Sequence, residues 1–465
     1  MKLEKPLVME AGKDTLELWN RELRASSVEK PSRVRPPRFA KIRQIRTQLK
    51  LSGLKLPLAL SLLNQCISSG GNFLLSVYLA RTLALSDFGL YGIGYGLCML
   101  YVGIGNAVIM TQMLVNMPSK AIEDRHIYAA KMLNAVLLLG LTFIVLSTGV
   151  IGITSIAVSD KLVYFQTCCA IVTAAIFFLC SEFFIAYAYL IRRESLALVV
   201  NGLTMFVLFL CLAYEYQAGI IPTAESVMYF YALGAAIGAI TAYGMSNLKL
   251  RQGFRNLKPD MNEAWQHGRW ALGGVLVTWM QSQTYAYIAI IFLGPIGVGQ
   301  ANAAKIFISP FSFLLPAINK IALPRLADLH QTDPARMLRI SMLMTTCLSL
   351  LAIIFSFVLI GNLDSISDLV LGRQDATIRS LIWIWCLMLV CQMARSGGSV
   401  LLQIQRKFRI LTLLNIPSAI VTLVLAFLLI KTYGTAGAIW SMVAGELVLS
   451  LLIWWEILNE KNRPH

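Results

Sequence analysis

Long apolar runs dominate this sequence. A helix rises ~1.5 Å per residue, so ~20 apolar residues are enough to cross a hydrocarbon core ~30 Å thick. About twelve runs of roughly this length occur, at residues 58–80, 90–115, 129–153, 162–190, 196–215, 227–246, 269–293, 301–323, 338–360, 380–402, 410–430 and 437–458. Composition agrees, because 57% of the residues are hydrophobic and only 14% are charged, whereas about a quarter of a soluble domain is charged. The sequence therefore predicts an all-α, polytopic membrane protein with about twelve transmembrane helices.

The N-terminal region is not typical of a cleaved signal. Residues 1–50 are too polar for a secretory signal peptide, and the first apolar run, which begins near Leu58, is too long for one. We expect that run to insert and remain. The nine cysteines all lie in predicted spans and form no CxxC pair, so we expect no disulfide framework, no metal site and no cofactor.

Basic residues in the loops orient the chain. Loops rich in lysine and arginine lie on the cytoplasmic side of the membrane. Alternate loops carry such residues: Arg192 and Arg193, Lys249 to Lys258, Arg325 to Arg339, and Arg406 to Arg409. The intervening segments 216–226 and 294–300 have none. With an even number of spans, both termini are expected in the cytoplasm, and most of the +16 net charge lies on the inner leaflet.

The tail before the first span is strongly basic. In residues 30–50, Phe39, Ile42, Ile45 and Leu49 recur at helical spacing among lysines and arginines. Such a segment suits the surface of an anionic membrane. The alternative is a tail whose charges only enforce the topology. Nucleic acid is not an expected partner, since a membrane-tethered tail needs none.

The spans divide into two sets of six. The predicted boundaries are a tail at 1–50, a first half at 51–246, a cytoplasmic connection at 247–267 and a second half at 268–465. The halves echo each other, because "LARTLALSDFGLYGIGYGL" follows the first span and "IFLGPIGVGQANAAKI" follows the seventh. Two halves of equal helix count and orientation indicate a parallel repeat, which places a site at the interface between halves.

Polar residues occupy corresponding spans. Asn64, Ser68 and Asn72 fall on one face of the first span, and Gln281 and Gln283 lie near the middle of the seventh. At this depth such side chains face other helices or water rather than lipid. Two interpretations stay open, hydrogen bonding between helices and the lining of a shared cavity that meets substrate.

A charged residue within an apolar run costs several kcal/mol at the bilayer centre if it has no partner, and five such residues call for a reason. They are Glu182, Lys305, Lys320, Arg395 and Glu446. Lys305 and Lys320 are near enough to span ends to reach the interface along their own side chains. Arg395 lies deeper, and Glu446 is placed to neutralise it.

Two prolines, Pro310 and Pro316, interrupt the run that contains Lys305. Each proline removes a backbone donor and clashes with the preceding turn, so the helix is expected to kink. Such breaks are tolerated where the backbone faces protein or a wet cavity. We therefore expect this helix to form a cavity wall, with Lys305 on it.

The motifs of enzymes are missing from the sequence. The single Gly-Lys pair, Gly12-Lys13, is followed by Asp14, so there is no nucleotide-binding phosphate loop. The four histidines lie in predicted loops or at the terminus, away from intramembrane carboxylates. A membrane glycan polymerase or transferase would need a large outer loop or catalytic acids, and the outer loops are short. The sequence predicts a protein that is not an enzyme.

Two stretches resemble a known family. Residues 77–112, "VYLARTLALSDFGLYGIGYGLCMLYVGIGNAVIMTQ", are similar to the first two helices of the Wzx-type polysaccharide exporters. Residues 289–329 contain Pro324-Arg325-Leu326 near their end. They are similar to the signature of the seventh and eighth helices in the same exporters. These exporters belong to the superfamily, called MOP, that also contains the multidrug MATE exporters and the lipid II flippases.

The resemblance implies a flippase in a bacterial inner membrane. Its substrate would be an undecaprenyl-pyrophosphate-linked oligosaccharide for O-antigen, capsule or exopolysaccharide synthesis, moved by ion-coupled alternating access. Lys305 and Arg395 would attract the pyrophosphate, and the polar residues of the first and seventh spans would meet the sugar. Glu182 or Glu446 would carry the coupling ion. A polysaccharide polymerase and a chain-length regulator are the implied protein partners.

Two other functions remain open at this point. A MATE-like exporter would favour an anionic, aromatic pocket for organic cations. A scaffold of a glycan assembly complex would use the basic tail as its docking element.

Overall fold

The computed structural model describes residues 39–154, 161–253, 257–312, 332–372, 375–405 and 407–461, with scattered positions between 315 and 330. The chain divides into two compact units, Met1–Leu56 and Pro57–His465. Helix α2 (Phe39–Thr82) covers most of the tail segment predicted to be amphipathic, but the side chains of that segment lie outside the described part. The second unit contains every helix of membrane-spanning length and hydropathy found among the described residues.

The first half of this unit is a series of long helices joined by short turns. Its elements are α2, α3 (Leu85–Gly105), the π-helix η1 (Asn106–Met110), α4 (Thr111–Asn116), the 3-10 helix η2 (Met117–Ser119), α5 (Ile122–Thr154), α6 (Lys161–Leu190), α7 (Glu194–Gln217) and α8 (Ala224–Ser246). α3, η1, α4 and η2 follow one another without a break and form a single pass.

The second half follows the same plan. Its elements are α9 (Leu250–Gly253), α10 (Leu257–Ile306), α11 (Ser309–Ser312), α13 (Pro334–Gly361), α14 (Leu363–Leu371), α15 (Ala376–Ile404) and α16 (Phe408–Lys461). Much of the predicted connection 247–267 is therefore helical, in α9 and the start of α10. The boundaries proposed for the halves stay a prediction.

Nine helices in the described residues are long and apolar enough to cross a membrane. Two of them contain two passes each, because α10 turns at Gly294 and α16 turns at Gly434. Both glycines have positive φ, 69° and 58°, a conformation that glycine adopts without strain. Helix α2 is not among the nine, although it contains the first predicted span, residues 58–80. The prediction of an all-α membrane protein with about twelve spans is confirmed.

Helix starts follow from capping residues in the sequence. α8 begins with a capping box, in which Thr223 and Ser226 exchange side-chain to backbone hydrogen bonds. Asp333 accepts a hydrogen bond from the amide of Arg336 ahead of Pro334, the first residue of α13. Asp375 caps α15 in the same way, through the amides of Thr377 and Ile378.

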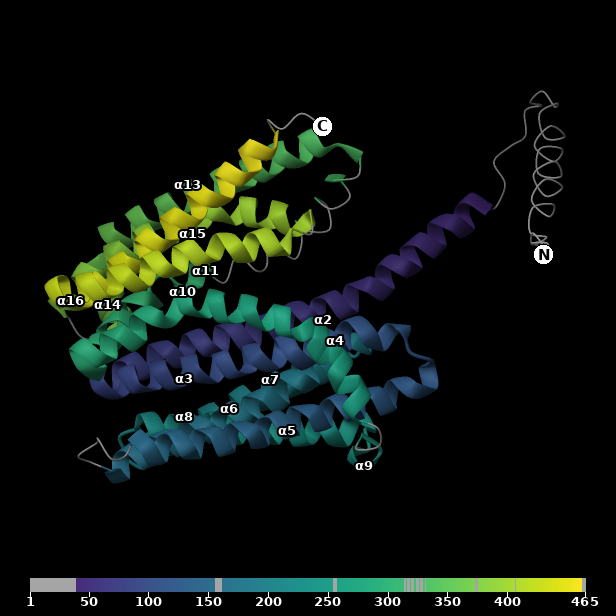
Figure 1. Ribbon diagram of the computed structural model, residues 1–465, viewed down its shortest axis with the longest axis horizontal. Coiled ribbons are helices and arrows are strands. Elements are labelled where there is room, and N and C mark those ends of the chain that lie inside the picture. Colours follow the sequence, from purple (N-terminus) through teal and green to yellow (C-terminus); the bar gives the residue numbers. More distant parts are fainter. Residues whose placement is uncertain are drawn as a thin grey trace, which may run out of the picture. The chain divides into compact units, whose positions relative to one another are not determined.

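The packing joins neighbouring helices into two groups with α10 between them (Figure 1). α6, α7 and α8 pack together in the first half, and α13, α15 and α16 pack together in the second. α10 contacts both α16 and α3 extensively, so it connects the halves. One large cluster of buried apolar side chains runs through both halves, and a smaller cluster around Leu326, Met337 and Leu449 lies in the second.

Candidate functional site

The two echoing segments found in the sequence cross each other. A Cβ atom added at Gly89 of α3 would lie 2.0 Å from the carbonyl oxygen of Pro295, and one added at Gly299 would lie 2.0 Å from that of Leu85. Only residues without a side chain permit this approach. The halves therefore meet where α3 passes residues 295–306 of α10.

A second contact joins the halves at the end of α2. The Arg81 guanidinium donates to the carbonyl oxygens of Val370 (3.2 Å) and Asp368 (3.3 Å), and also to that of Leu369. These carbonyls belong to the last turn of α14, where helical partners are few; the Asp368 carbonyl also accepts from the amide of Gly372 (3.1 Å). A cation is favourable there because the helix dipole is negative at its C-terminus.

Polar side chains of α10 line the crossing. A Cβ atom at Gly92 would lie 2.1 Å from Nδ2 of Asn302, and the side-chain oxygen of Asn302 accepts a hydrogen bond from the Tyr285 hydroxyl (3.2 Å). At Gly96 the nearest atoms are the Tyr287 hydroxyl (3.5 Å) and Oε1 of Gln283 (4.0 Å). Gln283, one of the predicted site residues, thus faces the first half.

Lys305 lies one turn beyond Asn302 on the same helix. Because the helix resumes at Pro295, before the predicted start at 301, Lys305 is about ten positions or ~15 Å from its beginning. That depth is about half the thickness of a hydrocarbon core ~30 Å across. Lys305 is therefore deeper than a lysine that reaches the outer interface along its own side chain.

Among the described residues, Lys305 has no counter-ion. Its Nζ lies 5.4 Å from the ring centroid of Trp385, and the Trp385 indole donates to the carbonyl oxygen of Ala301 (3.0 Å). No described carboxylate forms an ion pair with it. The side chain is half-buried, and its place on a cavity wall stays a prediction.

The helix breaks directly after Lys305. α10 ends at Ile306, and the carbonyl oxygen of Lys305 accepts from the amide of Ile308 (3.2 Å) and the hydroxyl of Ser309 (3.1 Å). Pro310 has no amide hydrogen to continue the helical ladder. The predicted break at Pro310 is confirmed. Pro316 and Lys320 lie outside the described residues.

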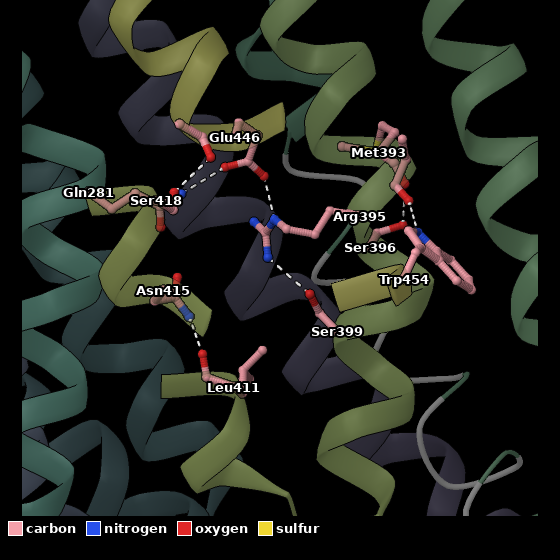
Figure 2. Close-up of polar contacts among 12 residues, drawn as sticks. Gln281, Met393, Arg395, Ser396, Ser399, Leu411, Asn415, Ser418, Glu446 and Trp454 are labelled. Atoms are coloured by element: carbon pink, nitrogen blue, oxygen red, sulfur yellow. Dashed lines mark hydrogen bonds and ion pairs between the residues drawn. The ribbon is translucent and has the colours of Figure 1, made fainter. Parts of the chain in front are cut away.

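Arg395 and Glu446 form an ion pair inside the second half (Figure 2). Arg395 Nε donates to one Glu446 oxygen, and a second guanidinium nitrogen donates to the Ser399 hydroxyl (3.0 Å). The second Glu446 oxygen accepts from Nε2 of Gln281 (3.2 Å). Glu446 is only 4% exposed, whereas the Arg395 side chain is 23% exposed, so the carboxylate is withdrawn from solvent and the guanidinium is half-buried.

This cluster is separate from Lys305. Arg395 comes about ten positions after Trp385 on α15, which places it ~15 Å further along the helix axis. Gln281 is held by Glu446, whereas Gln283 faces α3. The structure thus divides the predicted substrate residues of the second half between an inner ion pair and the crossing between halves.

Two of the predicted site residues on α2 form hydrogen bonds with other helices of the first half. Asn64 on α2 donates to the Tyr189 hydroxyl (2.9 Å) and accepts from Asn201 (2.9 Å). Asn72 accepts from the Tyr231 hydroxyl (2.8 Å) and donates to the carbonyl oxygen of Ser68 (2.9 Å). These bonds tie α2 to α6, α7 and α8. Hydrogen bonding between helices therefore describes this set.

Glu182 on α6 is the remaining predicted residue. It is half-buried, and in the described part of the chain it has neither a hydrogen bond nor an ion pair. Tyr95 and Tyr231 are close enough to interact electrostatically with it, and their rings stack 6.1 Å apart. The first half thus contains a carboxylate beside an aromatic cluster.

The sequence analysis did not predict several residues that contact the predicted site residues. Trp385 lies mid-span, whereas membrane tryptophans usually gather at the interfaces, and this position was a usable signal. Tyr189, Asn201 and Tyr231 gave no such signal, because their pairing with α2 depends on how the helices are arranged.

Comparison with known proteins identifies the fold. No family model matches the sequence, and no curated protein matches it. Among solved structures, the lipid II flippase MurJ in an inward closed conformation matches with a TM-score of 0.71 at 10% identity, over 87% of each chain. The fold is that of the MOP transporters.

Two MATE transporters share this fold at lower scores. The eukaryotic MATE transporter AtDTX14 has a TM-score of 0.62 at 12% identity, over 88% of this chain and 96% of its own. An inward-facing multidrug resistance MATE transporter of the MOP superfamily has a TM-score of 0.61 at 14% identity, over 86% and 96%. The chain is therefore a multi-pass membrane protein with the MOP fold, and these identities leave its substrate to be argued from its own residues.

Proposed function

We propose that this protein is a flippase that moves a polyprenyl-pyrophosphate-linked oligosaccharide across a bacterial inner membrane by alternating access. The observation that carries the proposal is Lys305, a cation at mid-span depth without a counter-ion among the described residues. An isolated ammonium in a bilayer is costly, so its presence calls for an anionic ligand.

The chemistry of such a substrate fits this position. A pyrophosphate and its sugars cannot cross hydrocarbon without a polar path, while the lipid tail can remain in the bilayer. Lys305 stands beside the crossing between halves, together with Asn302, Gln283 and Tyr287. Amides and hydroxyls there can donate to and accept from a sugar. The resemblance to Wzx-type exporters and the fold shared with a lipid II flippase support the same class of substrate.

The ion pair changes the roles expected for Arg395 and Glu446. Each neutralises the other, so neither presents a free charge to a substrate. We assign the pair to holding α15, α16 and Gln281 together. The role of coupling-ion carrier then belongs to Glu182, the deep carboxylate outside any ion pair of the described residues. A polysaccharide polymerase and a chain-length regulator remain the proposed protein partners.

A MATE-like cation exporter is the second candidate. Glu182, with Tyr95 and Tyr231 beside it, is the observation that favours it, because a carboxylate near aromatic faces attracts organic cations. Both candidates use Glu182, the flippase to carry the coupling ion and the cation exporter to bind its substrate. Only the flippase needs the positive charge of Lys305, so Lys305 separates them.

Reconstitution separates them. The full chain in proteoliposomes is supplied with a fluorescent polyprenyl-pyrophosphate oligosaccharide, and the label that reaches the opposite leaflet is measured. We expect Lys305→Arg to keep at least about a third of the rate, Lys305→Gln to lose about tenfold, corresponding to ~1.4 kcal/mol, and Lys305→Glu to lose more. Ethidium efflux is measured in parallel. Efflux that depends on Glu182 and ignores Lys305, without lipid movement, would contradict the flippase and support the cation exporter.

A further inference from the structure

A large cavity opens at the end of the first half that carries the basic loops. Its volume is about 910 Å³, and it is lined by the end of α4 and η2, the start of α5, the end of α6 and the end of α8. None of these lining segments takes part in the crossing between α3 and α10. The cavity is therefore distinct from the site proposed for transport.

Its charged lining is entirely basic. Arg125, Arg192 and Arg193 line it, with His126 beside them, and none of its described lining residues is acidic. The acidic residues of the adjoining turns, Glu123, Asp124 and Glu194, are outside the lining. Three guanidinium groups around one cavity attract an anion with several acceptor oxygens.

The basic groups are held in place to different extents. Arg125 donates to the carbonyl oxygens of Pro118 (2.9 Å) and Lys120 (3.2 Å), and two of its five N–H donors are thereby used. His126 shares a hydrogen bond with the Tyr187 hydroxyl (3.2 Å). The side chains of Arg192 and Arg193 have no hydrogen bond or ion pair in the described part of the chain. The cavity thus presents guanidinium donors that the protein leaves unused.

The backbone of the cavity wall is strained. Among the described residues, the two non-glycine residues with positive φ are Arg192 (57°) and Asn247 (58°), and both line this cavity. Asparagine tolerates the left-handed conformation, but an arginine there is uncommon and costs free energy. A glycine would make the same turn without strain. The strain at Arg192 therefore indicates that its side chain is needed at that point.

Most of the other lining residues are apolar, with Ser246 and Asn247 as the polar exceptions beside the two tyrosines. Leu114, Leu190 and Ile191 contribute to the wall, and Leu114 and Tyr189 are 41% and 37% exposed. A phosphate group alone would fill a small fraction of the volume. The combination of guanidinium groups with apolar side chains, at a membrane-facing end of the helices, matches a phosphate that carries a hydrophobic body.

We propose that this cavity binds the phosphate group of an anionic membrane lipid at the inner-leaflet surface. Arg192 and Arg193 provide the free donors, and Arg125 provides a fixed charge. Ordinary basic loops, which only orient the chain, need neither a cavity nor a strained backbone. The site is independent of the proposed transport function.

The test uses the purified full chain in an uncharged detergent. Binding of dioctanoyl phosphatidylglycerol is titrated by native mass spectrometry for the wild type, for Arg192→Gln with Arg193→Gln, and for Arg336→Gln with Arg339→Gln. The last pair is the matched control, because it removes two basic residues near the start of α13, away from the cavity. We expect Kd to rise at least about tenfold in the first double variant and less than about twofold in the control.

Arg192→Gly provides a second arm. It removes the guanidinium and relaxes the backbone, so it should fold at least as well as the wild type and still bind the lipid more weakly. Equal affinity in wild type, Arg192→Gly and the double variant would overturn the site. Inorganic phosphate that binds as tightly as the lipid would overturn the assignment to a lipid. Equal loss of affinity in the control pair would show a general charge effect and also overturn it.

Discussion

The two halves share a helical plan and differ in the charges that they enclose. In the first half, the polar residues of α2 are neutral and bond to tyrosines and an asparagine of neighbouring helices, and the deep charge is a carboxylate, Glu182. In the second half, an arginine–glutamate pair joins α15 to α16, and the deep charge outside any pair of the described residues is an ammonium, Lys305.

The comparison distinguishes glycines that the contact between halves requires from charged residues that can differ between the halves. Glycine contacts at Gly89 and Gly299 are equivalent in the two halves, because both halves must approach along α3 and α10. Side chains that hold helices together can be neutral, as around Asn64, or charged, as around Arg395. A deep charge without a counter-ion stabilises nothing by itself. We therefore propose that Lys305, Gln283 and Glu182 serve transport and that Asn64, Asn72, Gln281, Arg395 and Glu446 hold helices together.

The largest expected effect comes from the ion pair of the second half. Glu446→Ala leaves the half-buried Arg395 without its partner. Removal of one partner of a fully buried pair costs roughly 3–5 kcal/mol, and we expect a value at the lower end because the Arg395 side chain is 23% exposed. Thermal unfolding of the purified protein should show a large loss of stability. Replacing both residues by methionine should recover most of it. Glu456→Ala is the control, because Glu456 lies on the same helix and forms no ion pair with another described residue. A Glu446→Ala protein as stable as the wild type would contradict a structural role for the pair.

A smaller effect is expected where the halves touch through Arg81. Arg81→Ala removes the hydrogen bonds to the last turn of α14 and should weaken the contact by about 1 kcal/mol, or roughly fivefold. A cysteine at position 302 should then react severalfold faster with an impermeant thiol reagent. Arg379→Ala is the matched control for Arg81→Ala, because Arg379 pairs with Asp364 of α14 within the second half. An equal increase in both variants would mean that α14 is merely loosened.

The smallest effect is expected in the neutral network of the first half. Asn72→Ala removes one hydrogen bond between α2 and α8, and such bonds in membranes contribute about 0.6 kcal/mol on average. Stability should fall by about that amount, and the transport rate per folded molecule should stay within about twofold. Ser76→Ala, whose hydroxyl bonds within its own helix, is the control. A tenfold loss of transport in Asn72→Ala would contradict a purely structural role and indicate that Asn72 contacts the substrate.

Much of the fold could be predicted because membrane spans are set by length and hydropathy. The start of the eighth span was placed too late, since the turn depends on the left-handed conformation of Gly294, which hydropathy does not reveal. The break at Pro310 was predicted, because proline acts on its own helix.

The site was harder to predict than the fold. The sequence identified Lys305, Glu182 and Arg395 as charges that need a partner or a function, since a charged residue in an apolar run can be recognised without a structure. It could not assign their partners. Whether Arg395 meets a substrate or Glu446 depends on the rotation of α15 against α16, which hydropathy does not fix.

Thiol chemistry at position 305 tests the central claim most directly. Lys305→Cys is made in a background with the nine native cysteines replaced, two of which, Cys66 and Cys347, are exposed. A cysteine on a hydrated cavity wall should react with a membrane-impermeant thiol reagent. In Asn302→Cys, made in the same background with Lys305 retained, a short-chain polyprenyl pyrophosphate should slow that reaction at least about threefold, because Lys305 attracts its anion. The account predicts both reaction and protection. An inert cysteine at position 305, or one at position 302 that reacts equally fast with and without the pyrophosphate lipid, would contradict it.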